Sequence, residues 1–147
     1  MTRYVIGPDV ALRLAEQQAV VAGGHQLVAP TLLRSQVLSL LYVEVRRANI
    51  SRKDADRRLD YLRGLRIRLL GDRVLQRLAW EVADQFAWSD TYVAEYVALT
   101  RLQADAFITL DAALALTVSP LVKVAAIDDL LGSRRRPGPP RATTKSR

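Results

Sequence analysis

Short apolar runs alternate with longer amphipathic stretches along most of the chain. The runs are rich in Val, Ile, Leu and Phe and end at turn-forming or charged residues, which is typical of buried β-strands. We therefore predict strands at 3–6, 26–29, 66–70 and 106–109, with 122–125 as the candidate for a fifth.

Residues that cap helices stand between these runs. A side-chain oxygen of Ser, Thr, Asp or Asn accepts a hydrogen bond from the first free amides of a helix. We expect such helix starts at Asp9, at Ser51 (with Asp54, in an S-x-x-D pattern), at Asp72 and at Ser89.

The stretch after Pro30 predicts a further helix. Its apolar residues Leu33, Val37, Leu40 and Leu41 recur at the spacing of one helical face. Proline is common at the first position of a helix, where its missing amide hydrogen is not needed. We therefore expect this helix to open at Pro30.

Strands separated by long helical crossovers indicate a parallel sheet that is covered on both faces. We predict one α/β domain over 1–131, with three layers and a four- or five-stranded parallel sheet flanked by helices. Ligands of such sheets gather beyond the carboxyl ends of the strands. The positions of interest are therefore 7–9, 109–111, and the turns around Gln36 and Val93.

Composition excludes several kinds of site. The 147 residues contain no cysteine and one histidine, so disulfides, thiolate metal sites and multi-histidine zinc sites are excluded. The single His25 lies in GGHQ, which predicts a solvated turn. No apolar stretch is long enough for a membrane span or a secretory signal, so we expect a cytoplasmic protein with no membrane partner.

The net charge of +7 belongs to the end of the chain. Segment 132–147 holds six basic residues and no acid, which leaves 16 basic residues against 15 acids in the rest of the sequence. This segment is rich in proline and lacks large apolar residues, so we predict a disordered basic tail. Such a tail could hold phosphate by charge or serve only as a solvated extension.

No glycine-rich phosphate loop and no G-x-S-x-G pattern is present, so carboxylate chemistry is what remains. Four segments occur in an informative order: YVIGPDVALRLAE, APTLLRSQVLSLLY, ANISRKDADRRLDYL and SDTYVAEYVALTRLQADAFITLDAALA. Together they resemble the PIN domain family, in particular the VapC-type toxins of bacterial toxin–antitoxin pairs. The resemblance covers Tyr4 to Leu131.

The resemblance implies a Mg- or Mn-dependent endoribonuclease whose metal is held by four acids. The matching positions in this chain are Gly7, Gln36, Val93 and Asp111. The interval of 18 residues from Val93 to Asp111 agrees with the family layout, so the match is not shifted. Only Asp111 is an acid, and one carboxylate does not neutralise a divalent ion. We therefore expect the metal site to be weakened or lost.

Two nearby acids are candidates for compensation. Asp9 follows Gly7 by two residues, and Asp90 precedes Val93 by about one helical turn. Both are also explained as ordinary residues of helix starts. Val93, beside Tyr96 and Val97, is expected to be ordinary core packing.

Candidate RNA or partner contacts are Thr109 and the arginines around one helix–turn–helix, Arg46, Arg47 and Arg52. A solvated polar face is the alternative explanation for the arginines. Tyr92 and Tyr96 are four residues apart and could stack on a base, although buried packing is the commoner role at that spacing.

Three hypotheses follow. The first is a VapC-like toxin component of a type II toxin–antitoxin system with a degenerate metal site, a small VapB-like antitoxin as partner and a homodimeric state. The second is a non-catalytic PIN-fold protein that binds an antitoxin or RNA. The third is an active ribonuclease with relocated acids Asp9, Asp90 and Asp111.

Overall fold

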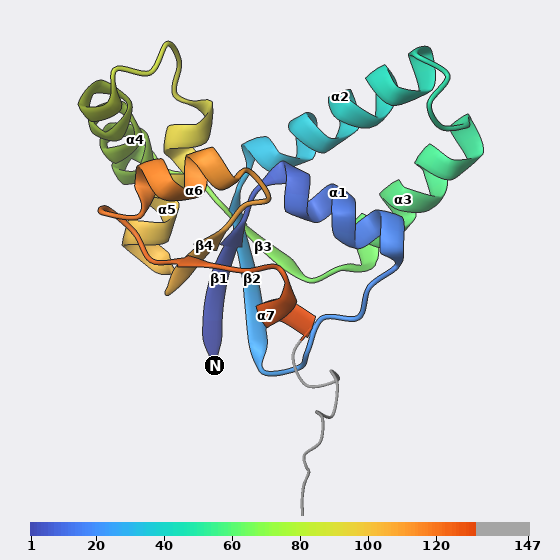
Figure 1. Ribbon diagram of the computed structural model, residues 1–147, viewed down its shortest axis with the longest axis horizontal. Coiled ribbons are helices and arrows are strands. Elements are labelled where there is room, and N and C mark those ends of the chain that lie inside the picture. The colour runs from blue at the N-terminus through green and yellow to red at the C-terminus, as the bar shows by residue number, and fades with distance from the viewer. Residues whose placement is uncertain (132–147) are drawn as a thin grey trace, which may run out of the picture.

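The computed structural model describes residues 1–131, and its centre is a five-stranded sheet in which every strand is parallel to its neighbours. The strand order is β3-β2-β1-β4-β5 (Figure 1). The bounds are β1 (Thr2–Ile6), β2 (His25–Pro30), β3 (Ile67–Leu70), β4 (Ala106–Ile108) and β5 (Val124–Ala125). The predicted α/β class and parallel sheet are confirmed, with the fifth strand present. The predicted disordered tail lies outside the described residues.

Helices flank this sheet. Their bounds are α1 (Pro8–Gln17), α2 (Leu32–Arg46), α3 (Arg52–Gly64), α4 (Arg73–Phe86), α5 (Tyr92–Gln103), α6 (Ala112–Val118) and α7 (Asp128–Leu131). Figure 1 shows α1, α2 and α3 gathered on one side of the view and α4, α5 and α6 on the other. Within residues 1–131, no helix combines the length and the apolar character that crossing a bilayer requires.

The central strands are buried on both faces. Successive side chains of a strand point to opposite faces of the sheet. Val5 and Ile6 of β1 are both 0% exposed, and Phe107 and Ile108 of β4 are 2% and 0% exposed. Helices therefore cover both faces at the middle of the sheet, which is the reason these strands are continuous apolar runs rather than alternating ones.

The register of β1 and β4 brings two chain segments together at the carboxyl edge. Ile6 pairs with Ile108, and the amide of Gly7 donates to the carbonyl of Ile108 at 3.2 Å. The residues that follow β1 and β4 therefore lie side by side although about 100 positions separate them in the sequence.

Two of the predicted helix caps are confirmed and two are wrong. Ser51 accepts from the amide of Asp54 at 3.0 Å, and Asp72 accepts from Leu75 at 2.9 Å. Asp9 does not cap α1, which begins at Pro8 with Gly7 as its N-cap. Helix α5 has Thr91 as its N-cap in place of Ser89.

Two further local predictions are wrong. Pro30 ends β2 and does not open α2, because it still pairs with Leu70 of β3 and the next amide, that of Thr31, donates to the carbonyl of Leu70 at 3.2 Å. His25 is the first residue of β2 and not part of a turn. Its ring meets the ring of Tyr4 edge to face, with ring centroids 5.2 Å apart.

Candidate functional site

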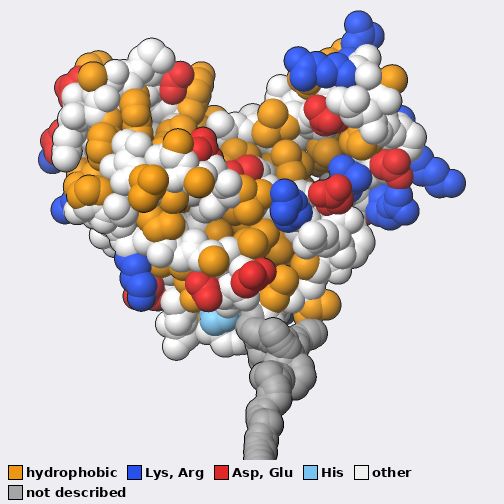
Figure 2. All heavy atoms as spheres, viewed as in Figure 1, with side chains coloured by type: hydrophobic (Ala, Val, Ile, Leu, Met, Phe, Trp, Pro, Cys, Tyr) orange, Lys and Arg blue, Asp and Glu red, His pale blue; other side chains and the backbone are white. Residues whose placement is uncertain are grey.

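A cavity of about 160 Å³ opens where β1 and β4 end. All four positions matched by the family resemblance line it, together with residues from α1, α5 and α6. The lining residues are Gly7, Pro8, Asp9, Gln36, Val93, Tyr96, Phe107, Thr109, Asp111 and Leu114. Figure 2 shows acidic side chains among apolar ones in the depression between the two halves of the molecule. We call this cavity the cleft.

Asp9 joins the start of α1 to the loop that follows β4. Its Oδ1 accepts from the amide of Val10 at 2.8 Å. Its Oδ2 accepts from the hydroxyl of Thr109 at 3.0 Å and from the amide of Leu110 at 2.8 Å. Both oxygens of this carboxylate are thus engaged by protein hydrogen-bond donors.

Gly7 lies directly against this carboxylate. A Cβ built on Gly7 would be 2.7 Å from Asp9 Oδ1, which is closer than real Cβ contacts. The backbone of Gly7, with φ −76° and ψ 168°, is in a region open to every residue type. A Cβ at this position would therefore require the Asp9 carboxylate to shift, whereas the backbone conformation imposes no restriction.

Gln36 and Tyr96 close the cleft from α2 and α5. The Tyr96 hydroxyl donates to Gln36 Oε1 at 2.5 Å, and Tyr96 is 2% exposed. Burial, followed by the charges of Glu95 and Asp9, raises the pKa of Tyr96 well above its ordinary range. The phenol therefore stays protonated at neutral pH and remains a donor to Gln36.

The prediction that Val93 packs in the core is wrong. Val93 is 37% exposed and lines the cleft, so it is not ordinary core packing. Tyr96 and Val97, one turn further along α5, are buried as expected. Tyr92 is 53% exposed and does not line the cleft, which leaves the proposed base stacking of the two tyrosines without a shared surface.

Asp111 is the acid that the resemblance retains, and it has a structural role as well. It is the N-cap of α6, and its Oδ1 accepts from the amide of Leu114 at 3.1 Å. The side chain is exposed at the mouth of the cleft. One carboxylate oxygen therefore serves the helix, while the aspartate still contributes negative charge to the cleft.

Asp90 is not brought into the cleft. Its Oδ1 accepts from the amide of Tyr92 at 3.1 Å, which is an interaction of the loop before α5. Among the described residues, no three His, Asp or Glu side chains lie close enough together to hold a metal ion.

The residues present do not fit a magnesium or manganese site. Such ions prefer several oxygen ligands and at least one or two carboxylates free to bind them. The cleft offers Asp9, whose oxygens are both occupied, and Asp111, which caps a helix. Gln36 Oε1, the remaining matched oxygen, is engaged by Tyr96.

The candidate arginines do not line the cleft. Arg46 ends α2, ten residues after Gln36, and is therefore about 15 Å further along the helix axis. Arg47 follows it, and both are exposed. Arg52 pairs with Asp56 at 3.1 Å on the exposed surface of α3. These residues lie around the connection between α2 and α3, and no basic residue of the described part of the chain lines the cleft.

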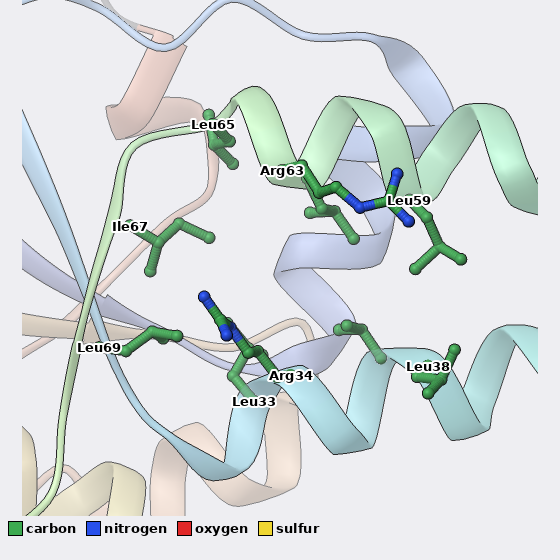
Figure 3. A pocket seen from close by; sticks show the side chains of 10 residues that line it. Leu33, Arg34, Leu38, Leu59, Arg63, Leu65, Ile67 and Leu69 are labelled. Atoms are coloured by element: carbon green, nitrogen blue, oxygen red, sulfur yellow. The ribbon is translucent and has the colours of Figure 1, made fainter.

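A second hollow was not predicted from the sequence. A groove of about 470 Å³ lies between α2, α3 and β3, and we call it the arm groove. Figure 3 shows Leu38, Leu59 and Leu65 facing this space, with Arg34 and Arg63 beside it. Its lining residues are Leu33, Arg34, Val37, Leu38, Leu59, Leu62, Arg63, Leu65, Ile67 and Leu69.

A sequence signal for the arm groove exists in α2. Of the predicted apolar face, Leu33, Val37 and Leu41 are buried, whereas Leu40 is 43% exposed. Leu38 lies beside that face and is 56% exposed. A helix that carries apolar residues beyond one face has more apolar surface than its own core contact needs. That excess indicates a further packing surface.

Comparison with known proteins supports the fold. The crystal structure of PAE2754 from Pyrobaculum aerophilum is similar, with a TM-score of 0.65 and 18% sequence identity, over 88% of this chain and 94% of that chain. At this identity the likeness concerns the α/β architecture alone. No protein-family model and no curated protein sequence matches the chain.

Proposed function

We propose that this chain is a VapC-like protein of the PIN domain class in which the nuclease metal site has been lost. The observation that carries the proposal is the content of the cleft. The four matched positions Gly7, Gln36, Val93 and Asp111 line one cavity, at the edge of the sheet where ligands of such folds bind, yet only one of them is an acid.

The electrostatics of the cleft argue against RNA cleavage. A metal-dependent nuclease uses its ion to neutralise the phosphate and to generate a hydroxide nucleophile. In this cleft Asp9 and Asp111 contribute negative charge with no compensating basic residue among the lining side chains. Without a cation, these carboxylates repel a phosphate group. The relocated set of Asp9, Asp90 and Asp111 does not assemble either, because Asp90 lies outside the cleft.

An RNA cleavage assay tests this proposal. Structured RNA such as tRNA is incubated with the protein and Mg²⁺ or Mn²⁺, with and without a chelator. We expect no metal-dependent product above the level of an Asp111→Asn variant, which keeps the helix cap but removes the charge. Cleavage that requires the metal and disappears in Asp111→Asn would show that the site is active.

A second candidate function, binding of a small VapB-like antitoxin, is favoured by the arm groove. The groove presents leucines on three elements, and Leu38 is 56% exposed. Arg34 and Arg63 lie beside these leucines (Figure 3). Arg63 is paired with Asp60, so among the described lining residues Arg34 is the basic side chain left to meet an acid. An apolar segment with an acidic residue opposite Arg34 matches this surface in both hydrophobicity and charge. We therefore propose that the antitoxin inserts such a segment into the arm groove.

Co-purification with any small protein that is encoded beside this chain's gene, after co-expression, tests the second function. Leu38→Glu is expected to abolish the complex, because it places a charge among the leucines of the arm groove. Leu116→Glu is the matched control, since Leu116 is 77% exposed on α6 and does not line the groove. The same loss of binding in both variants, or no loss in either variant, would contradict a role of the arm groove. Sedimentation velocity of the free protein tests the homodimer that the resemblance implies.

A further inference from the structure

We propose that the carboxylate of Asp9 fills the space in the cleft that a side chain at position 7 would otherwise occupy. Asp9 and an acidic residue at position 7 therefore exclude each other as the carboxylate in this part of the cleft. The distance of 2.7 Å between Asp9 Oδ1 and an ideal Cβ on Gly7 is the basis of this inference. The backbone of Gly7 is extended and would accept any residue, so the exclusion comes from Asp9.

The carboxylate of Asp9 cannot move aside without loss. It is held by the amide of Val10, the hydroxyl of Thr109 and the amide of Leu110. Rotation of the side chain to admit a Cβ at Gly7 would break these bonds and leave the partly buried donors of Val10 and Thr109 without this partner. Because Thr109 and Leu110 belong to the loop after β4, the same movement would also release that loop from α1.

The exclusion explains how the polar side chains of the cleft are held, which the absence of three acids does not explain. The side-chain oxygens of Asp9 and Gln36 that face the cleft accept hydrogens from protein groups, and Asp111 Oδ1 accepts from Leu114. Protein donors therefore satisfy the hydrogen-bonding capacity of these oxygens, while the negative charges of Asp9 and Asp111 remain. This part of the inference rests on the proposed function, since it assigns position 7 to the acid set of a PIN-type site.

A double-mutant cycle tests the exclusion. Gly7→Ala is expected to lower the midpoint of thermal unfolding by roughly 3–8 °C when Asp9 is present. In an Asp9→Ala background the same Gly7→Ala change should be neutral or stabilising, because an alanine in an allowed backbone region lowers the entropy of the unfolded chain. An equal effect of Gly7→Ala in both backgrounds would overturn the proposal.

Asp9→Asn separates shape from charge in the same cycle. Asparagine has nearly the volume of aspartate, so Gly7→Ala should remain destabilising in the Asp9→Asn background. If Gly7→Ala becomes neutral there, the loss depends on the charge of Asp9 and not on the space that its side chain occupies, and the steric exclusion is wrong. Urea denaturation of the purified variants provides the same comparison for any that aggregate on heating.

A measurement of metal binding distinguishes failure of this inference from failure of the proposed function. One variant carries Gly7→Asp, Gln36→Glu and Val93→Asp with Asp9 retained, and a second adds Asp9→Ala. We expect the second to bind Mn²⁺ at least about tenfold more tightly, because the restored carboxylate at position 7 is then free. Equal manganese affinity with and without Asp9 would overturn the exclusion. Coupling in the alanine cycle without manganese binding in either variant would uphold the exclusion and overturn the PIN-type assignment of the cleft.

Discussion

The hydroxyl of Tyr96 donates a hydrogen bond to the side-chain oxygen of Gln36, 60 positions away in the sequence, and so links α5 to α2 across the cleft. In the proposed PIN-type assignment Gln36 takes an acid position, and its side-chain oxygen here accepts from a buried phenol. The bond therefore ties the side chain of Gln36 to the buried face of α5.

Tyr96→Phe is expected to destabilise the protein by about 0.5–1.5 kcal/mol, since it removes one hydrogen bond and leaves Gln36 Oε1 without this partner. Tyr92→Phe is the matched control, because Tyr92 is 53% exposed on the same helix. Urea unfolding of the three proteins measures the difference. A loss as large in Tyr92→Phe as in Tyr96→Phe would contradict the assigned role of the pair.

Stability is predicted to fall as the pH rises above about 10, the ordinary pKa of tyrosine. Burial raises the pKa of Tyr96, so above this pH the unfolded chain loses a proton that the folded protein keeps. The contribution is therefore complete below the unfolded pKa and is lost as the pH rises toward the folded one. Burial also raises the pKa of Tyr61, which adds a further loss of the same sign.

Unfolding free energies of the native protein and Tyr96→Phe, measured from about pH 8 to pH 11, check this dependence. The variant should show a shallower decline, with part of the slope retained through Tyr61. Identical slopes would mean that Tyr96 ionises in the folded protein as readily as in the unfolded chain.

Asp111→Ala should cost about 1 kcal/mol of stability, because Asp111 is the N-cap of α6. Asp111→Asn should leave stability nearly unchanged, since asparagine caps helices about as well as aspartate. Thermal unfolding of both variants measures the difference. A neutral alanine variant would show that the bond to Leu114 contributes little, and it would make alanine as suitable a control as asparagine in the cleavage assay.

The sheet and most helices could be predicted because their signals are local. Apolar runs located the strands, and Ser51 and Asp72 accept from amides three residues ahead, as the cap pattern requires. Asp9 shows where such reasoning fails. Asp9 is a residue type that caps helices, and it lies near a helix start. Its Oδ2, however, accepts from Thr109 and Leu110, which are 100 and 101 residues further along the chain. Only the pairing of β1 with β4 brings them within reach.

The cleft could be located but not described in detail from the sequence. The rule for ligand sites in parallel sheets, together with the resemblance, placed Gly7 and Asp111 at the same edge. Periodicity predicts that Val93 shares the buried face of Tyr96 and Val97, and this prediction is wrong. Val93 lies in the first turn of α5, where that face extends past the core into the cleft, and it is 37% exposed. The spacing of apolar residues predicts which face of a helix is buried, but not how far along the helix the core covers that face.

Protein hydrogen bonds hold the polar side chains of the cleft, and we propose that the cleft does not bind a catalytic divalent ion. Titration calorimetry of the full chain with Mn²⁺ tests this proposal most directly, with Asp111→Asn as the control. We expect no specific binding of Mn²⁺ with a Kd below about 1 mM, and the same small heats of titration in Asp111→Asn. A one-to-one isotherm in the micromolar range that disappears in Asp111→Asn would contradict it.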